Sequence, residues 1–181
     1  VMSTLESDAY PFAKTEAERA AWRRFHTAPP HAKPALVTIL PGIVFGPPLA
    51  PEHAKSTSVS LACGAYMGAF ADVAATPPFA IAVSDVREVA LAHVRALQNA
   101  RAAGRYVLSR DVAMTVPEMF APLKAKWPTR AWPDACAPIA KKLRFDASKT
   151  HRQLGVSFRP LQETMEDTLA ALLEFGALPP P

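Results

Sequence analysis

The chain has 181 residues and a mass of 19.5 kDa; half of its residues are hydrophobic and a fifth are charged. This balance is typical of one ordinary globular domain and excludes a disordered, collagen-like or low-complexity protein. The longest apolar stretch, residues 35–49, is interrupted by prolines and glycines. It is shorter than the roughly 18 residues of a membrane span, so we expect no membrane partner.

The formal net charge is +4 and the isoelectric point is about 9.3. The basic residues are scattered, whereas a nucleic-acid-binding protein carries a basic stripe with interleaved aromatic residues, so we expect no nucleic-acid partner. Cys63 and Cys136 are too few for a disulfide scaffold, and the histidines share no metal-binding spacing. Residues 1–9 do not resemble a signal peptide. We therefore expect a cytoplasmic protein without a bound metal.

The first predicted element is a helix over residues 12–26, which is rich in alanine and places glutamate before arginine. Prolines end this helix, and the β-branched run at 35–40 predicts a buried strand that Pro41 and Gly42 terminate. A loop over 47–55 then leads to a helix predicted over 56–68.

The second half of the chain continues the alternation of strands and helices. We predict a strand at 79–83, then an amphipathic helix to about residue 102 that Ser84 or Asp85 caps. The remaining predicted elements are a strand at 105–109, a helix at 116–126, a further strand at 142–145, helical turns at 148–154 and a final helix at 160–175. Such alternation favours an α/β sheet protein.

Tyr10 and Lys14 carry the clearest chemical signal. They lie four residues apart at the start of the first predicted helix, so their side chains share one face if the helix includes both. An ammonium group beside a phenol favours the phenolate form, and such a pair can deliver a proton to a carbonyl oxygen. The same spacing occurs in many helices without a catalytic role. The glycines stand singly at turns and helix ends, so the sequence contains no phosphate-binding glycine-rich loop.

Longer segments give this pair a context. Y-P-F-A-K-T-E-A-E-R-A-A-W at 10–22, T-I-L-P-G-I-V-F-G-P at 38–47 and V-S-D-V-R-E-V-A-L-A-H-V-R-A-L at 83–97 occur in this order. Together with G-R-Y-V-L-S at 104–109 and the segments 146–156 and 158–168, they resemble the extended short-chain dehydrogenase/reductases over nearly the whole chain. The most similar branch contains dihydroflavonol 4-reductase, cinnamoyl-CoA reductase and NADPH-dependent aldehyde/ketone reductases.

The resemblance implies the C-terminal portion of an NAD(P)-binding Rossmann-type fold plus a small α/β substrate region, with the N-terminal βαβ units missing. Residues 1–50 would belong to the nucleotide-binding domain, with the strand at 35–40 in its parallel sheet. Residues 51–181 would form mainly the substrate region, including the strands at 79–83 and 105–109, with some segments free to return to the Rossmann-type sheet. About 30 residues per βαβ step puts the missing part at roughly 130 to 160 residues.

The resemblance also implies an oxidoreductase that reduces an aldehyde or ketone. We expect its cofactor to be NADP(H) rather than NAD(H), and we expect no metal. Tyr10 would donate the proton, and Lys14 would assist it and hold the nicotinamide ribose. Further cofactor contacts are implied for Pro41, Gly42, Ile43, Val44 and Ser58. For Pro41 and Gly42 the alternative is a tight turn that ends a strand, and for Ser58 it is a helix cap.

The remaining candidates concern the substrate and the architecture. Met67, Phe70 and Phe79 are candidates for the substrate pocket, although residues of this kind also pack in cores. Within the segment 83–97 the resemblance implies structural roles, with Asp85 as a helix cap and His93 as a hydrogen-bonded histidine between domains.

The family's glycine-rich turn, its NAD- or NADP-selecting residue and its active-site serine or threonine have no counterpart in this sequence. We therefore expect the chain alone to bind NADPH weakly and to be inactive. A polypeptide that supplies the missing N-terminal half is the expected partner, besides a small carbonyl substrate. The alternative is a non-catalytic fragment or subunit that keeps the fold and binds a protein through an exposed sheet edge.

Overall fold

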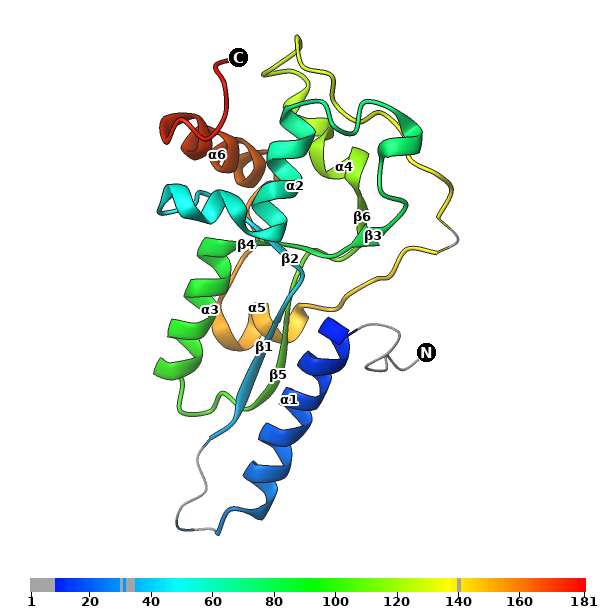
Figure 1. Ribbon diagram of the computed structural model, residues 1–181. Helices are drawn as coiled ribbons and strands as arrows, with labels where there is room; N and C mark the ends of the chain where they lie inside the picture. Colours follow the sequence, from blue (N-terminus) through cyan, green and yellow to red (C-terminus); the bar gives the residue numbers. More distant parts are fainter. Residues whose placement is uncertain (1–8, 30, 32–34, 140) are drawn as a thin grey trace.

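The computed structural model describes residues 9–29, 31, 35–139 and 141–181. Figure 1 shows two parts, one above the other, and each part contains its own cluster of buried hydrophobic side chains. Within the described ranges, no helix combines the length and the apolar character needed to cross a membrane.

The lower part is built on two parallel strands, β1 (Val37–Pro41) and β5 (Gly104–Leu108). Helices lie on both faces of this pair: α1 (Ala9–Thr27) on one face, and α3 (Val86–Gln98) with α5 (Ser148–Leu154) on the other. The layering is that of an α/β sheet, as the alternating pattern predicted.

Alternation of side chains along the strands explains this layering. Val37, Ile39 and Tyr106 pack in the lower core with residues of α3 and α5. Thr38 has the opposite orientation, and its hydroxyl donates a hydrogen bond to Glu18 of α1 at 3.1 Å. The strand pair therefore makes apolar contacts with α3 and α5 on one face and polar contacts with α1 on the other.

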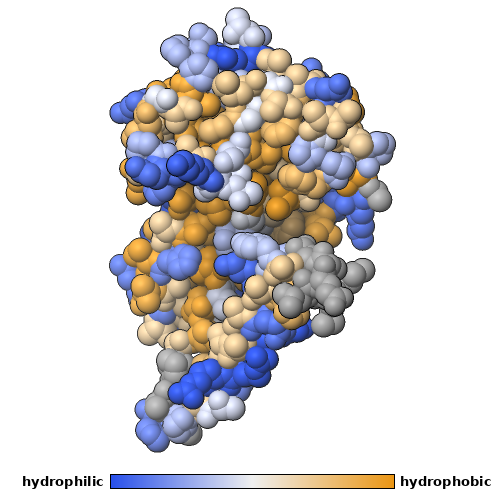
Figure 2. Space-filling view, in the orientation of Figure 1, coloured by the Kyte–Doolittle hydropathy of each residue, from blue (hydrophilic) through white to orange (hydrophobic). Residues whose placement is uncertain are grey.

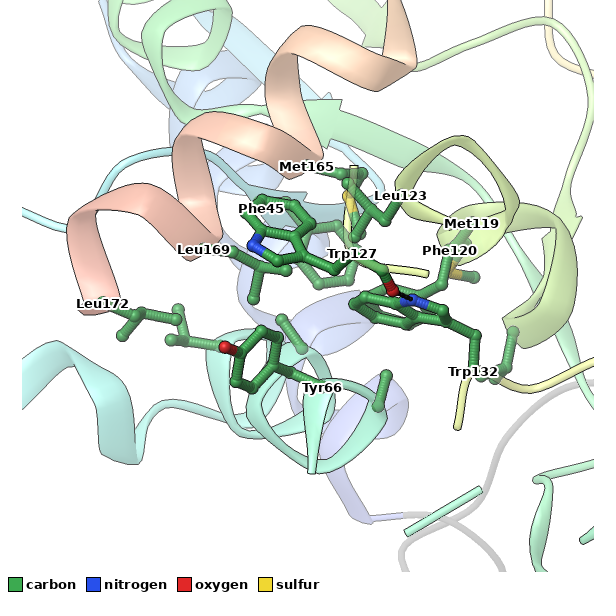
Figure 3. Close-up of a cluster of buried hydrophobic side chains, with 14 of the residues drawn as sticks. Phe45, Tyr66, Met119, Phe120, Leu123, Trp127, Trp132, Met165, Leu169 and Leu172 are labelled. Carbon is green, nitrogen blue, oxygen red and sulfur yellow. Dashed lines mark hydrogen bonds between the residues drawn. The ribbon is translucent and has the colours of Figure 1, made fainter. Parts of the chain in front are cut away.

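The upper part holds the larger core, shown in Figure 3. It is filled by side chains of α2 (Thr57–Tyr66), α4 (Val116–Phe120) and α6 (Leu161–Glu174) and by the tryptophans that follow α4. The rings of Phe120 and Trp132 stack with their centroids 6.2 Å apart. Burying aromatic residues of this size supplies much of the stabilisation available to a small lobe.

Short strands join the two parts. The strands β2 (Ile43–Phe45) and β4 (Val83–Asp85) form a parallel pair. The strands β3 (Ala80–Ile81) and β6 (Met114–Thr115) form an antiparallel pair. The 3-10 helices of the described chain are η2 (Pro51–Lys55), η3 (Val73–Ala75) and η4 (Ala121–Leu123).

Several predicted boundaries differ from the structure. We predicted that Pro41 and Gly42 terminate the strand at 35–40. In the structure a second strand, β2, begins directly after Gly42. The strand predicted at 79–83 is divided between β3 and β4, which have different partners. The helix predicted at 116–126 breaks into α4 and η4 where a proline, which lacks an amide hydrogen, begins a new turn. At 142–145 the structure has a single bridge, between Arg144 and Val112, in place of a strand.

The placement of the strand at 105–109 in the substrate region was wrong. This segment forms β5 and pairs in parallel with β1, so it belongs to the same sheet. Sequence periodicity shows that a strand exists but does not show which strand lies beside it. The domain boundary near residue 50 stays a prediction.

Candidate active site

Tyr10 and Lys14 lie one turn apart near the start of α1. The Nζ atom of Lys14 is 5.5 Å from the centroid of the Tyr10 ring, a distance at which a cation interacts with an aromatic face. Tyr10 is 72% exposed, so its phenol is accessible to a molecule entering from solvent. The helix thus holds a phenol and an ammonium together, as their spacing predicted.

A cavity of about 740 Å³ lies between α1 and the end of β1. It brings together residues predicted from separate segments of the sequence. Its lining includes Tyr10, Lys14, Pro41, Gly42, Val44 and, from α3, His93. A cavity of this volume is large enough for a small organic ligand.

Ser84 fixes the backbone that forms the floor of this cavity. Its hydroxyl accepts a hydrogen bond from the Gly42 amide at 2.9 Å and donates one to the Leu108 carbonyl at 2.5 Å. The next amide, of Ile43, donates to the Ala82 carbonyl at 2.7 Å. These bonds hold the junction between β1 and β2 against β4 and β5. Ile43 is therefore fixed in place, but it is not among the residues that line the cavity.

Gly42 is required here by close approach of the backbone. A Cβ atom at this position would lie 2.1 Å from the carbonyl oxygen of Ala82, well inside van der Waals contact. The segment Pro41–Gly42 thus does more than terminate a strand. It lets β1 continue into β2 while the chain passes close to the neighbouring segment.

Glu18 attaches α1 to the sheet. Its carboxylate accepts hydrogen bonds from Nε and Nη2 of Arg105 at 2.8 and 3.2 Å, and from Thr38 and Trp22. Burial alone would raise the pKa of Glu18, but these donors hold it below its ordinary value. Since α1 has no buried residue, this polar contact positions the helix that carries Tyr10 and Lys14. The sequence analysis did not single out Glu18, because its partners are distant in the chain.

His93 also lines the cavity, a position that the sequence analysis did not foresee. Its Nδ1 lies 2.7 Å from the carbonyl oxygen of Val89 and therefore donates to it. The imidazole is hydrogen-bonded, as expected, but it is exposed on α3. Only the packing of α3 beside β1 brings it near Tyr10.

Ser58 lies on the first turn of α2, away from the Tyr10 cavity. It lines a second hollow of about 500 Å³, whose other lining residues include Ser56, His53 and Arg87. Val44 lines both hollows, so the two spaces are neighbours. Ser56, not Ser58, occupies the position before α2, and its side chain makes no capping hydrogen bond.

The three substrate-pocket candidates are spread over the upper part. Phe70 packs against the larger core, whereas Met67 and Phe79 are exposed. None of the three lines the cavity at Tyr10. Their role in substrate binding stays a prediction.

The start of α3 carries an ionic network around a buried carboxylate, Asp85, whose partners are partly exposed. Asp85 caps the helix by accepting the Arg87 amide at 2.8 Å, and it pairs with the Arg87 guanidinium at 2.7 Å. Arg87 also binds Asp167 of α6 at 2.6 Å. Burial would raise the pKa of Asp85, but the bonds from Arg87 keep it below its ordinary value. This network joins α3 to α6, which agrees with the structural role predicted for Asp85.

Glu88 completes the cap of α3 by accepting the Asp85 amide. It also accepts the Arg159 amide at 2.5 Å. Burial raises the pKa of Glu88, and the nearby charge of Asp85 raises it further. Among the residues that the structure describes, no group of three or more His, Cys, Asp or Glu side chains is arranged to hold a metal ion.

Comparison with known proteins finds relatives that are reductases. No protein-family model matches the chain. Cinnamoyl-CoA reductase 1 of Arabidopsis thaliana is 34% identical over 177 residues, which cover 94% of this chain and 48% of the reductase. The NADPH-dependent methylglyoxal reductase GRE2 of Saccharomyces cerevisiae is 28% identical over 178 residues, 93% of this chain and 52% of the enzyme. The chain spans about half the length of the curated relatives it matches.

Solved structures agree with these sequence relatives. Yeast methylglyoxal/isovaleraldehyde reductase Gre2 in complex with NADPH superposes with a TM-score of 0.78 and 27% identity, covering 97% of this chain and 55% of Gre2. Gre2 of Candida albicans with NADPH gives a TM-score of 0.76 and 26% identity, over 92% of this chain and 51% of that one. The predicted Rossmann-type α/β fold is confirmed. The chain is therefore related to the extended short-chain dehydrogenase/reductases and corresponds to their C-terminal half.

Proposed function

We propose that this chain is the C-terminal part of an NADP(H)-dependent oxidoreductase that reduces an aldehyde or a ketone. The observation that carries the proposal is the cavity at the end of β1, in which a phenol and an ammonium group lie together beside a fixed backbone turn. The named relatives support it, because one is a cinnamoyl-CoA reductase and another is an NADPH-dependent methylglyoxal reductase.

The residues present fit the reactive end of the cofactor. The cavity offers the Tyr10 phenol, the Lys14 ammonium and the backbone at Pro41, Gly42 and Val44 on adjacent walls. It lies at the C-terminal end of β1, where open α/β sheets bind their ligands. NADPH, when bound, supplies the hydride that no amino-acid side chain can provide.

Tyr10 holds the proton that the reduction consumes. Negative charge develops on the carbonyl oxygen of the substrate during reduction, and a proton donor placed there removes that charge. Lys14 lies against the ring of Tyr10 and places a positive charge beside the group that donates the proton. Both side chains project from one rigid helix, so their mutual geometry does not depend on a loop.

Other residues take supporting roles in this proposal. The backbone at Pro41, Gly42 and Val44 contacts the nicotinamide end of the cofactor, and Ile43 supports that backbone through the hydrogen bond of its amide to the Ala82 carbonyl. Ser58 lies toward the phosphates of the cofactor. Met67, Phe70 and Phe79 belong to the substrate side. The glycine-rich phosphate-binding turn is to be supplied by an N-terminal half, since the sequence of this chain contains none.

One observation favours a second function, a non-catalytic subunit that binds a protein partner. The backbone of β1 has a strand neighbour on one side only, among the residues that the structure describes. An open strand edge is a site for pairing with another chain, whether or not the assembly is catalytic. Retention of both Tyr10 and Lys14 beside the cavity favours the catalytic assignment.

Steady-state kinetics of the completed protein, with the N-terminal half supplied, test the assignment. Tyr10→Phe removes the proton donor, so kcat should fall by about 100-fold or more while NADPH affinity is largely retained. Lys14→Met should lower both kcat and NADPH affinity. Lys141→Met, which changes an exposed lysine outside the cavity, is the control. A Tyr10→Phe enzyme with unchanged kcat would rule out the role of Tyr10.

Calorimetry of the chain alone gives a second test. Because the chain carries no glycine-rich turn, it should bind NADPH weakly or not at all by itself. Micromolar affinity of the isolated chain for NADPH would show that residues 1–181 already contain a complete cofactor site.

A further inference from the structure

The chain turns back over the upper part after α6. Gly176 has a φ of 66°, the left-handed conformation that commonly ends a helix, and its amide donates to the Leu173 carbonyl at 3.0 Å. The Ala177 amide then donates to the Leu172 carbonyl at 2.9 Å. These bonds direct residues 177–181, the tail, back toward the end of α2, and Figure 1 shows the two segments near each other.

The first part of the tail carries an apolar anchor. Figure 2 shows many apolar residues at the surface of the upper part, but Leu178 is only 5% exposed and belongs to the larger core. Burial of a leucine side chain strengthens a contact by about tenfold or more. The tail therefore enters the core through one large side chain, as a bound peptide does.

Two side chains then hold the tail by its backbone. The Tyr66 hydroxyl donates to the Pro179 carbonyl at 3.0 Å, and Nη2 of Arg130 donates to the Pro180 carbonyl. Proline has no amide hydrogen, and consecutive prolines favour an extended helix without internal hydrogen bonds, so their carbonyls are free to accept. A phenol and a guanidinium, which both donate, therefore match the only polar groups that such a backbone offers.

Contacts outside the tail orient both donors. The Arg130 guanidinium lies 4.2 Å from the centroid of the Tyr66 ring, and its Nη2 donates to the Tyr66 oxygen at 2.9 Å. The rings of Trp127 and Trp132 lie 6.2 and 6.1 Å from that of Tyr66, and Figure 3 shows the three side chains together. Donors that are held in place in this way lose little freedom when a ligand arrives, which favours binding.

We infer that Tyr66, Arg130, Trp127 and Trp132 form a binding site, the tail site, for a peptide in which prolines follow a leucine. Residues 178–180 of the chain itself are its occupant. Proteins recognise proline-rich segments with grooves that aromatic side chains line, and the tail site has this composition. The inference goes beyond the proposed function, because no residue of the tail site lines the cavity at Tyr10.

The short connection to α6 makes the chain's own tail the favoured occupant. Residues 175–177 alone separate the end of α6 from Leu178. A short connection gives the tail a high effective concentration at the site, so the tail of a second copy would have to displace it. Occupied in this way, the tail site joins the end of α2 to the end of α6.

A peptide titration tests whether the tail site recognises a separate ligand. The chain ending at Gly176 is titrated with the N-acetylated peptide Ala-Leu-Pro-Pro-Pro, the sequence of residues 177–181, and tryptophan fluorescence is followed. We expect saturable binding, and the peptide with alanine in place of leucine should bind about tenfold or more weakly. Equal affinity for the two peptides would overturn the inference. So would an absence of binding by a shortened chain whose circular dichroism shows that it is folded.

Two arginine variants of the shortened chain locate the binding site. Arg130→Gln removes the guanidinium that donates to the tail, so it should weaken peptide binding by about tenfold or more. Arg101→Gln changes an exposed arginine of the lower part and should leave the affinity unchanged. Equal affinities of the two variants would overturn the assignment of Arg130.

Variants of the full chain test the site without shortening it. Tyr66→Phe and Arg130→Gln each remove a donor to the tail, so NMR should show the Ala177 amide exchanging about tenfold or more faster. The matched control is Tyr106→Phe. Tyr106 is also fully buried, and its hydroxyl donates to Gln153 at 2.7 Å in the lower part. This control should leave exchange at Ala177 unchanged.

The full-chain variants decide the question if the shortened chain fails to fold. Unchanged exchange at Ala177 in Tyr66→Phe and Arg130→Gln would overturn the inference, because Leu178 would then hold the tail by itself. Equal acceleration in Tyr106→Phe would overturn it too, because the effect would reflect global stability. Analytical ultracentrifugation should find the full chain monomeric. A dimer that dissociates when residues 177–181 are deleted would assign the tail to the site of a second copy and overturn the assignment to the chain's own tail.

Discussion

The hydroxyl of Ser84 accepts the Gly42 amide at 2.9 Å, across 42 residues of sequence. It donates its own proton to the Leu108 carbonyl, so one side chain joins the β1–β2 junction to the end of β5. Ser84 is buried, which makes both bonds costly to lose. This contact holds in place the backbone that lines the cavity beside Tyr10.

Replacing Ser84 tests that contact. Ser84→Ala leaves the partly buried amide of Gly42 and the buried carbonyl of Leu108 without their partner, so the free energy of unfolding should fall by about 1–3 kcal/mol. Ser60→Ala, which removes an exposed hydroxyl bonded to the Ala54 carbonyl, should change it by about 0.5 kcal/mol or less. Urea denaturation of both variants measures the difference. Equal effects would show that the Ser84 bonds contribute no special stability.

Gly42→Ala should be among the most damaging small substitutions. The added methyl group would meet the Ala82 carbonyl at 2.1 Å, and backbone cannot move aside as a flexible side chain can. We expect a loss of roughly 3 kcal/mol or more in unfolding free energy.

Gly176→Ala is the matched control for Gly42→Ala. Gly176 has a φ of 66° but no atom within 4 Å of an added Cβ. It should cost only the conformational penalty of about 1–2 kcal/mol. Thermal unfolding of both variants makes the comparison, and a Gly42→Ala protein as stable as Gly176→Ala would contradict the packing argument.

Glu18→Gln should loosen α1 more than it destabilises the whole protein. Glu18 and Arg105 are partly exposed, so the expected loss of stability is about 0.5–1 kcal/mol. Hydrogen exchange along α1 should increase, because this helix has no buried residue to hold it. Glu16→Gln breaks only the contact with Arg19 inside the helix and should leave exchange unchanged.

The effect of Glu18 should depend on pH in a defined direction. Its folded-state pKa is lowered, so its contribution is present above the unfolded value of about 4.3 and is lost as pH falls through the folded pKa. The difference in stability between wild type and Glu18→Gln should therefore shrink on acidification. A difference that grows as pH falls would contradict this assignment.

Asp85 and Glu88, three residues apart, should titrate in opposite directions from their ordinary values. Bonds from Arg87 lower the pKa of Asp85 against the effect of burial, whereas burial and the charge of Asp85 raise the pKa of Glu88. Carbon-detected NMR of the side-chain carboxyl groups should find Asp85 below about 3.9 and Glu88 above about 4.3. Glu88 titrating below its ordinary value would be inconsistent with its buried position.

The same shifts have opposite consequences for stability. The contribution of Glu88 is fully present below its unfolded pKa and is lost as pH rises through its raised folded pKa. The contribution of Asp85 is present above its unfolded pKa and is lost as pH falls through its lowered folded pKa.

Much of the local structure could be predicted from the sequence because its causes are local. The helix with Tyr10 and Lys14, the strand before Pro41 and the capping residue Asp85 follow from spacing, β-branched composition and hydrogen-bonding side chains close in sequence. The pairing of Tyr10 with Lys14 across one helical turn is of this kind, and it carries the proposed chemistry.

Contacts between distant segments were decided only by the tertiary structure. The pairing of β5 with β1, the bond of Ser84 to Gly42 and the attachment of α1 through Glu18 join residues that are 42 to 87 positions apart. No local preference encodes such a contact, because many strands and polar residues could satisfy the same pattern. Packing selects one arrangement by burying the apolar faces of all segments at once, and that selection places His93 at the cavity and leaves the edge of β1 open.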